Sequence, residues 1–136
     1  MHVGVVLRQS RTDWAGVLDS ARHAEEAGAD SVWVVDHLLG IPAQNGILEA
    51  WTLLSALAAS TERVELGAQV FCQSFRNPAL MAKMATTLDL ISGGRLHFLL
   101  GAGWFEAEYT GFGYDFPPPP CRSTPSCASM PSRRCR

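Results

Sequence analysis

The pair Asp36-His37 has the residue types that proton transfer requires. A histidine can gain or lose a proton near neutral pH, and an adjacent carboxylate can orient the imidazole ring and stabilise its charged form. This chemistry predicts His37 as a catalytic acid or base and Asp36 as its partner. The same two residues also allow a structural interpretation, in which Asp36 caps the following turn and His37 is merely exposed.

A second group of candidates includes the Gly-Ala-Gly-Trp segment at 101–104. Gly101 and Gly103 resemble part of a dinucleotide-binding fingerprint, but Glu106 stands where a third small residue is needed. We therefore expect the two glycines, which lack a Cβ, to let the backbone approach a flat ligand or a neighbouring strand. Trp104 is a candidate for the wall of a pocket. Cys72 could act as a nucleophile, but no base is evident nearby, so a half-buried packing role is the simpler interpretation.

The remaining polar candidates are expected to have structural roles. Glu106 and Glu108 fit a solvated first turn of a short helix, where the helix dipole favours acidic residues. His97 lies inside an apolar strand segment and is expected to be a hydrogen-bonded core residue. The four histidines are dispersed and the cysteines lack Cys-x-x-Cys spacing, so the sequence predicts no metal site.

These candidates must be positioned by a repeating pattern of strands and helices. Short apolar segments alternate with segments whose apolar residues recur at helical spacing, and one strand–helix unit takes about 30 residues. The continuous apolar runs predict parallel strands that are covered on both faces. The fold class is therefore α/β, either a doubly wound sheet or a (β/α)₈ barrel, and in both the reactive groups gather at the carboxyl ends of the strands. The predicted strands are 2–7, 31–35, 64–71 and 95–100, and the predicted helices are 12–27, 48–60, 78–92 and a short one near 105.

Composition changes abruptly near residue 120. Residues 1–120 hold all 13 acidic residues and all 12 glycines, whereas residues 121–136 have none of either but hold four Arg and three of the four Cys. We therefore expect a domain over 1–120 and an aberrant, disordered tail over 121–136. The net charge of −2 predicts no nucleic-acid partner. No apolar run reaches the length of a membrane span, about 18 residues, and the chain start lacks a leader pattern, so we expect a cytoplasmic protein without a membrane partner.

Three segments together resemble the luciferase-like monooxygenase family. They are Ala24–His37, Phe75–Leu96 and Gly101–Pro117, and the last is typical of the branch that uses the deazaflavin coenzyme F420. The resemblance covers residues 3–119 and implies a (β/α)₈ barrel that holds a flavin-like ring at the carboxyl ends of its strands.

The resemblance also implies the roles of particular residues. Asp36 and His37 would lie beside the ring, with His37 exchanging a proton, and a non-prolyl cis peptide bond would support the ring near Cys72-Gln73. Some relatives have a catalytic Glu where this chain has Trp104, so their oxidation of a sugar phosphate is not implied. The residues expected at the cofactor are Asp36, His37, Cys72, Gln73, Gly101, Gly103 and Trp104.

The chain predicts only the N-terminal half of such a barrel, because a complete barrel takes about 250 residues. We expect a flavin- or deazaflavin-dependent oxidoreductase, acting with F420 on a small-molecule substrate, that is truncated by a shift of reading frame near Pro120 and inactive alone. One alternative is an FMN-dependent monooxygenase that uses O2. Another is a non-enzymatic half-barrel remnant that associates with itself, and exposed half-barrel surface also makes a homodimer plausible.

Overall fold

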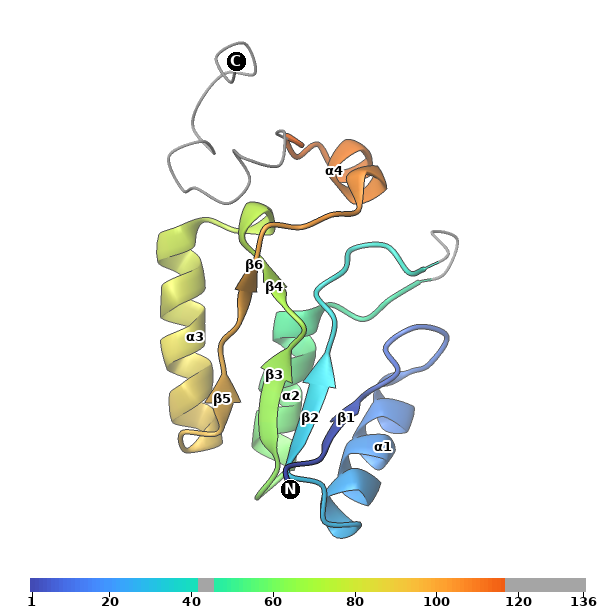
Figure 1. Ribbon diagram of the computed structural model, residues 1–136, viewed down its shortest axis with the longest axis vertical. Coiled ribbons are helices and arrows are strands. Elements are labelled where there is room, and N and C mark those ends of the chain that lie inside the picture. Colours follow the sequence, from blue (N-terminus) through green and yellow to red (C-terminus); the bar gives the residue numbers. More distant parts are fainter. Residues whose placement is uncertain (42–45, 117–136) are drawn as a thin grey trace.

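The computed structural model describes residues 1–41 and 46–116 of the 136-residue chain (Figure 1). The predicted tail at 121–136, the boundary at 120 and part of the loop before the second helix lie outside these residues. The strands are β1 (Gly4–Val6), β2 (Ser31–Val34), β3 (Glu65–Ala68), β4 (Phe71–Cys72), β5 (Leu96–His97) and β6 (Leu100–Gly101). The helices are α1 (Trp14–Glu26), α2 (Ala50–Ser60), the 3₁₀ turn η1 (Gln73–Phe75), α3 (Pro78–Ser92) and α4 (Glu106–Phe112).

The strands are parallel and form two sheets, a four-stranded one and a two-stranded one that lies above it in Figure 1. These sheets, with the segments packed on them, are the lower and upper layers of the molecule. The lower sheet has the order β1-β2-β3-β5, and β4 pairs with β6 above it. Two predicted strands, 64–71 and 95–100, are therefore each divided in two. The first division falls at Gln69–Val70, where the peptide bond is cis.

The ends of the helices follow the capping residues in the sequence. Asp13 accepts a hydrogen bond from the N–H of Gly16 at the start of α1, and Asn77 accepts from Ala79 and Leu80 at the start of α3. Gly93 ends α3 in the left-handed conformation with φ of 70°. Helix α2 begins two residues later than predicted, because Glu49 caps it by accepting from Trp51 and Thr52.

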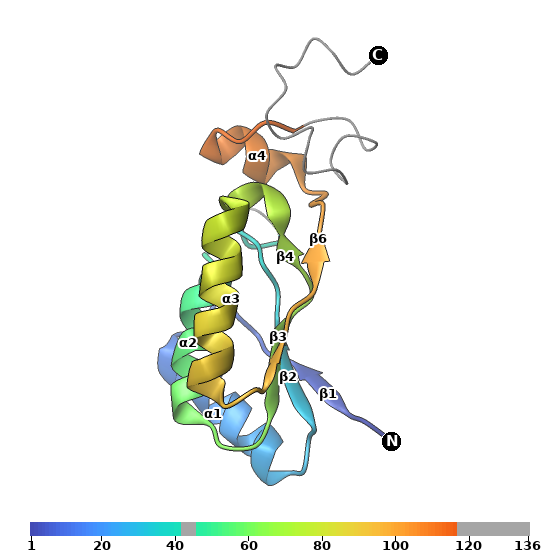
Figure 2. The ribbon, with the colours of Figure 1, turned by 90° about the vertical axis from the view of Figure 1, so that its left-hand side faces the viewer.

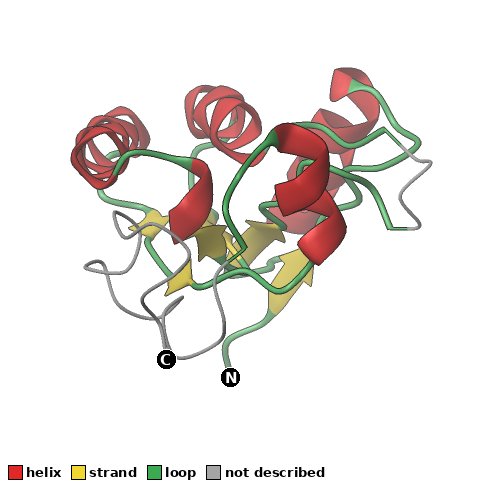
Figure 3. Cartoon of the chain, turned by 90° about the horizontal axis from the view of Figure 1, so that it is seen from above, coloured by secondary structure: helices red, strands yellow, loops and turns green. Residues whose placement is uncertain are grey.

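Helices α1, α2 and α3 cover the same face of the lower sheet (Figures 2 and 3). The prediction that both faces are covered is therefore wrong for the described residues: Val6 on β1 is 53% exposed. A doubly wound sheet carries helices on both faces, whereas a (β/α)₈ barrel carries them only outside. The one-sided cover fits part of a barrel, with the bare face in the position of the barrel interior.

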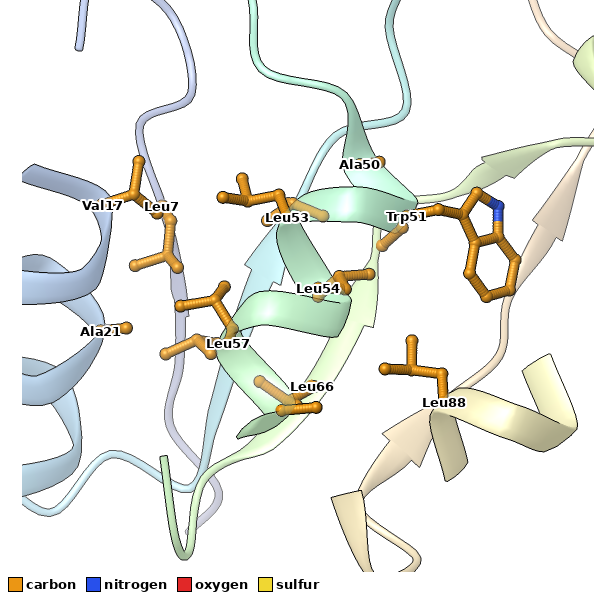
Figure 4. Packing of buried hydrophobic residues seen from close by; sticks show 14 of the residues in the cluster. Leu7, Val17, Ala21, Ala50, Trp51, Leu53, Leu54, Leu57, Leu66 and Leu88 are labelled. Atoms are coloured by element: carbon orange, nitrogen blue, oxygen red, sulfur yellow. The ribbon is translucent and has the colours of Figure 1, made fainter. Parts of the chain in front are cut away.

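The hydrophobic core lies between this sheet and the three helices (Figure 4). Alternate strand residues such as Val32 and Leu66 point into it, and Leu54 and Leu57 of α2 are fully buried opposite them. Trp51 stacks on Phe71 with ring centroids 4.2 Å apart, which links the core to the upper layer. Removing this apolar surface from water is the main stabilising contribution in the lower layer.

A single tryptophan dominates the bare face. Trp33 of β2 lies over Gly4 of β1 and Gly67 of β3, so that a Cβ on either glycine would collide with its ring. Its indole stacks on His97 with centroids 5.5 Å apart, and His97 forms an ion pair with Glu65 at 2.7 Å. His97 is hydrogen-bonded as expected, but it is exposed rather than part of the core, because this face carries no helix.

Candidate functional site

A cavity of about 300 Å³ lies at the carboxyl ends of the strands, between the upper strand pair and α4. The structure brings six of the seven predicted site residues together around it. Gln73, the first residue of η1, is not among the residues that line the cavity. The lining residues are Asp36, His37, Gln69, Val70, Cys72, Phe75, Gly101, Ala102, Gly103, Trp104 and Glu108.

His37 is held by a carboxylate that lies 71 residues further along the chain. Its Nδ1 is 3.1 Å from Oε1 and 3.0 Å from Oε2 of Glu108. The same Oε1 accepts hydrogen bonds from the backbone N–H groups of Leu38 at 2.6 Å and Leu39 at 2.9 Å. Glu108 therefore ties the end of β2 to α4 and orients the imidazole ring.

The expectation that Glu108 is solvated is wrong, because its side chain is only 2% exposed. Its neighbour Glu106 is exposed, as expected for the first turn of a surface helix. The two positions differ because Glu108 and Tyr109 lie on the buried side of α4. The amino-acid sequence does not show which of the two glutamates is buried. That depends on which side of α4 packs against the strand ends.

Asp36 contacts a different set of groups. Its Oδ2 accepts from the N–H of Cys72 at 2.8 Å, and its two oxygens receive both terminal nitrogens of Arg76, at 2.6 and 2.8 Å. The carboxylate beside His37 in the sequence is thus paired with Arg76, and Glu108 takes the orienting position at the imidazole. Asp36 is neither exposed nor simply a turn cap, because it joins the end of β2 to β4.

Arg76 bridges two carboxylates, since it also donates to Glu49 at 2.6 Å. Burial acts to lower the pKa of Arg76, but its hydrogen bonds and charge attraction to Asp36, and then to Glu49, raise that pKa above its ordinary value. Desolvation acts to raise the pKa of Glu49, but hydrogen bonds from Thr52, Trp51 and Arg76 together lower it. Sequence reasoning missed Arg76. Its position just before the Asn77 cap, shortly after a predicted strand, was the available signal.

The floor of the cavity requires glycine at position 103. Gly103 has φ of 74°, and a Cβ there would collide with the hydroxyl of Tyr109 and lie 2.9 Å from Sγ of Cys72. Tyr109 is fully buried, donates to the carbonyl of Ala102 at 2.9 Å and lies 3.3 Å from Sγ of Cys72. The thiol of Cys72 is thus packed against a hydroxyl, which agrees with a packing role.

The walls of the cavity are apolar and partly open. Trp104 is 65% exposed and Val70 is 41% exposed, and the ring of Trp104 meets His37 edge-on at 5.6 Å. The cis peptide bond that the structure describes lies between Gln69 and Val70. It was expected near Cys72-Gln73, so the expected position is wrong by three residues, although the bond lies beside the same cavity.

Among the residues that line the cavity, none is Lys or Arg. The described residues also contain no cluster of His, Cys, Asp or Glu that could hold a metal ion. Within the same part of the chain, no helix is long and apolar enough to cross a membrane.

Parallel strands with helices on one face, and a cavity at their carboxyl ends, define a partial (β/α) barrel of the kind that enzymes use. The sequence model of the luciferase-like monooxygenases matches residues 1–123. The chain belongs to the luciferase-like monooxygenase family.

The relatives in this family include a dehydrogenase and a monooxygenase. An F420-dependent glucose-6-phosphate dehydrogenase of Amycolatopsis mediterranei is 38% identical over 104 residues, which are 74% of this chain and 31% of that protein. The pyrimidine monooxygenase RutA of a Bradyrhizobium species is 46% identical over 66 residues, 48% of this chain and 18% of that protein. The chain thus spans less than a third of the length of each.

Two solved structures are also similar to this chain. An F420-dependent secondary alcohol dehydrogenase, solved with an F420-acetone adduct, matches with a TM-score of 0.77 and 28% identity over 89% of this chain and 37% of that one. The oxygenating constituent of 3,6-diketocamphane monooxygenase, solved with FMN, matches in fold with a TM-score of 0.71 and 24% identity, over 83% of this chain and 33% of that one.

Proposed function

We propose that this chain forms the catalytic wall of an F420-dependent oxidoreductase that acts on a small-molecule substrate. The observation that carries the proposal is the cavity in which His37, backed by Glu108, faces the glycine-containing backbone of β6. Two F420-dependent enzymes match 74% and 89% of the chain at 38% and 28% identity, whereas the FMN-bound structure matches 83% of the chain at 24% identity. The higher sequence identity of the F420-dependent enzymes favours F420 over FMN.

The residues of the cavity fit the flat ring of such a cofactor. Gly101 and Gly103 let the backbone lie close against Val70 and Tyr109, and Val70 and Trp104 present apolar surface to the cavity. The half-buried imidazole of His37, with a free ring edge, stands beside this surface. The cavity lining carries no cationic side chain for the cofactor's phosphate, so we expect the isolated chain to bind the cofactor weakly.

When bound, F420 would supply the chemistry of hydride transfer. This chain's own residues would position the ring and manage the proton. His37 would accept or donate the proton that accompanies the hydride, and Glu108 would stabilise the ring when it is charged. Arg76 and Asp36 would fix the end of β2 that carries His37. Trp104 would restrict water beside the reacting atoms.

The cofactor can be tested by adding F420 or FMN to the isotopically labelled chain and recording amide chemical shifts. We expect F420 to perturb the signals of residues 101–104 and His37 more strongly than FMN does at equal concentration. Trp104→Ala should weaken this response, whereas Trp14→Ala, which changes a tryptophan outside the cavity lining, should leave it unchanged. Larger shifts with FMN would instead favour the monooxygenase alternative.

The activity of the isolated chain is tested separately. Because the four strands of the lower sheet leave the barrel open, we expect no turnover of reduced F420 by the 136-residue chain. The measurement is the absorbance of the deazaflavin over time with candidate substrates. Turnover at the rate of a complete enzyme would show that one wall is sufficient.

A further inference from the structure

We propose that Glu108 is a positioning residue that fixes the proton of neutral His37 on Nδ1, so that Nε2 faces the cavity as a proton acceptor. The proposal rests on the proposed function for its catalytic meaning, but the position of the proton can be measured without any cofactor. It assigns a role to a residue that sequence analysis placed in solvent.

The hydrogen bonds around Glu108 determine where the proton lies. Two backbone N–H groups, from Leu38 and Leu39, converge on Oε1, and His37 Nδ1 lies within 3.1 Å of both carboxylate oxygens. An ionised carboxylate only accepts hydrogen bonds, so Nδ1 must be the donor. The neutral ring is therefore the Nδ1–H tautomer, and Nε2 carries the lone pair.

The opposite edge of the ring is free to react. Among the described residues, no hydrogen bond reaches Nε2, whereas His37 lines the cavity with its side chain 16% exposed. Trp104 and Phe105 meet the ring edge-on, at centroid distances of 5.6 and 6.2 Å. Turning the ring over would remove the donor from buried Glu108, which is costly because an unpaired buried charge loses its solvation.

The other carboxylate near His37 does not compete for this role. Asp36 receives Arg76 on both oxygens and the N–H of Cys72 on one of them. Its charge is paired within its own cluster. Glu108 thus remains the carboxylate that defines the state of the imidazole.

This arrangement predicts which ring nitrogen of His37 exchanges a proton with the substrate. A bound F420 would supply the hydride acceptor for the oxidation of a substrate hydroxyl group to a carbonyl group, and this oxidation also requires that the oxygen lose a proton. Nε2 of His37 would take that proton, and the resulting imidazolium would donate from Nδ1 to the Glu108 carboxylate. In the reverse direction the Nε2–H of the imidazolium would return the proton to the substrate oxygen.

The test is the tautomeric state of His37 in the full chain, measured by ¹⁵N NMR of the histidine rings at alkaline pH. We expect Nδ1–H for His37. His97 is an internal reference for the other tautomer, because its Nε2 contacts Glu65 at 2.7 Å and is expected to carry the proton. A neutral His37 found mainly as Nε2–H would overturn the proposal.

The variant Glu108→Gln makes the test sharper. Its amide oxygen should stay with the N–H groups of Leu38 and Leu39, which need an acceptor, so its NH₂ group would face Nδ1 as a donor. We therefore expect His37 to switch to Nε2–H, with the ratio of tautomers changing at least about tenfold. An unchanged tautomer in a folded variant would contradict the role of Glu108.

The matched control is Glu106→Gln, which changes an exposed carboxylate in the same helix and should leave the His37 tautomer unchanged. If Glu108→Gln does not fold, as judged by circular dichroism, the wild-type tautomer still decides the proposal. The two proposals fail separately. An Nδ1–H tautomer with a stronger response to FMN than to F420 would refute the cofactor, and an Nε2–H tautomer with a stronger response to F420 would refute the role of Glu108.

Discussion

The lower and upper layers of the molecule are held together by different physical means. Below, three helices and four strands enclose a continuous apolar core with fully buried leucines such as Leu54 and Leu57. Above, a small cluster of Cys72, Phe75 and Tyr109 lies among paired charges. Apolar packing is non-directional and tolerates adjustment, whereas the upper layer depends on a few directional contacts. The site lies in the layer that depends on individual residues.

The largest effect that separates the two layers should come from Arg76→Met. Removing the guanidinium leaves the side chain of Asp36, which is 1% exposed, as an unpaired buried charge, and such changes cost about 3–5 kcal/mol. Chemical denaturation measures the loss, and hydrogen exchange should place it first in the upper layer. Arg22→Met, at an exposed position of α1, is the control and should be nearly neutral. Equal losses in both variants would contradict the comparison.

Leu54→Ala should have a somewhat smaller effect, confined to global stability. Leu54 is fully buried in the lower core, and truncations of this kind cost about 2–5 kcal/mol. The free energy of unfolding should fall while the ring signals of His37 in the folded state stay unchanged. Leu90→Ala is the control, because Leu90 is 77% exposed. A change of the His37 signals would show that the layers are more strongly coupled than the contacts suggest.

Gly103→Ala tests the floor of the cavity. The added methyl group would collide with the Tyr109 hydroxyl at a residue with positive φ, and overpacking typically costs about 1–3 kcal/mol. Thermal unfolding measures this loss. Gly111→Ala is the matched control, because none of the described residues lies within 4 Å of the added Cβ and Gly111 is inside α4. The control should be neutral or slightly stabilising; a neutral Gly103→Ala would show that the Tyr109 contact can move.

Glu49 gives the molecule a dependence on acid pH. Burial acts to raise the pKa of Glu49, but the hydrogen bonds that it accepts hold that pKa below its ordinary value in the folded chain. Glu49 therefore contributes stability that is fully present above the ordinary pKa of Glu and is lost as pH falls through the folded pKa. Glu49→Gln should reduce stability at neutral pH by about 1 kcal/mol, as for the loss of a helix cap, and should flatten the acid side of the profile. Urea unfolding at several pH values measures both. Glu26→Gln, at an exposed position, should leave the profile unchanged.

The smallest effect on stability is expected for Leu100→Lys, which should act on self-association and not on folding. Leu100 of β6 is 51% exposed, and within the described residues β6 pairs only with β4. If a second copy binds this strand edge, Leu100→Lys should weaken the dimer about tenfold or more while folding is retained. Sedimentation measures the association. Leu90→Lys on α3 is the control, and an equal effect there would point to the helical face instead.

The sequence predicted the lower layer well because its signals are local. Asp13, Asn77 and Gly93 each act within a few residues, and the apolar periodicity places α1 and α3 correctly. The division of 64–71 into β3 and β4 was missed, because apolar residues stand on both sides of Gln69 and the segment reads as one strand.

The upper layer was predicted in outline only. The strand-end rule selected His37, Cys72 and Gly103 correctly as neighbours of one cavity. It could not assign Asp36 to Arg76 or His37 to Glu108, because those pairs join positions 40 and 71 residues apart. The packing of α4 and η1 against the strand ends brings these partners together. A local sequence pattern contains no information on that packing.

The indole of Trp33 also constrains how this sequence can change over evolution. It occupies the space above Gly4 and Gly67, so one large side chain fills the space that side chains at these two positions would need. An alanine at either glycine position fits only if Trp33 is replaced by a smaller residue in the same protein. The three positions should therefore covary among homologous sequences, and any polypeptide lying across this face must supply small side chains opposite the ring.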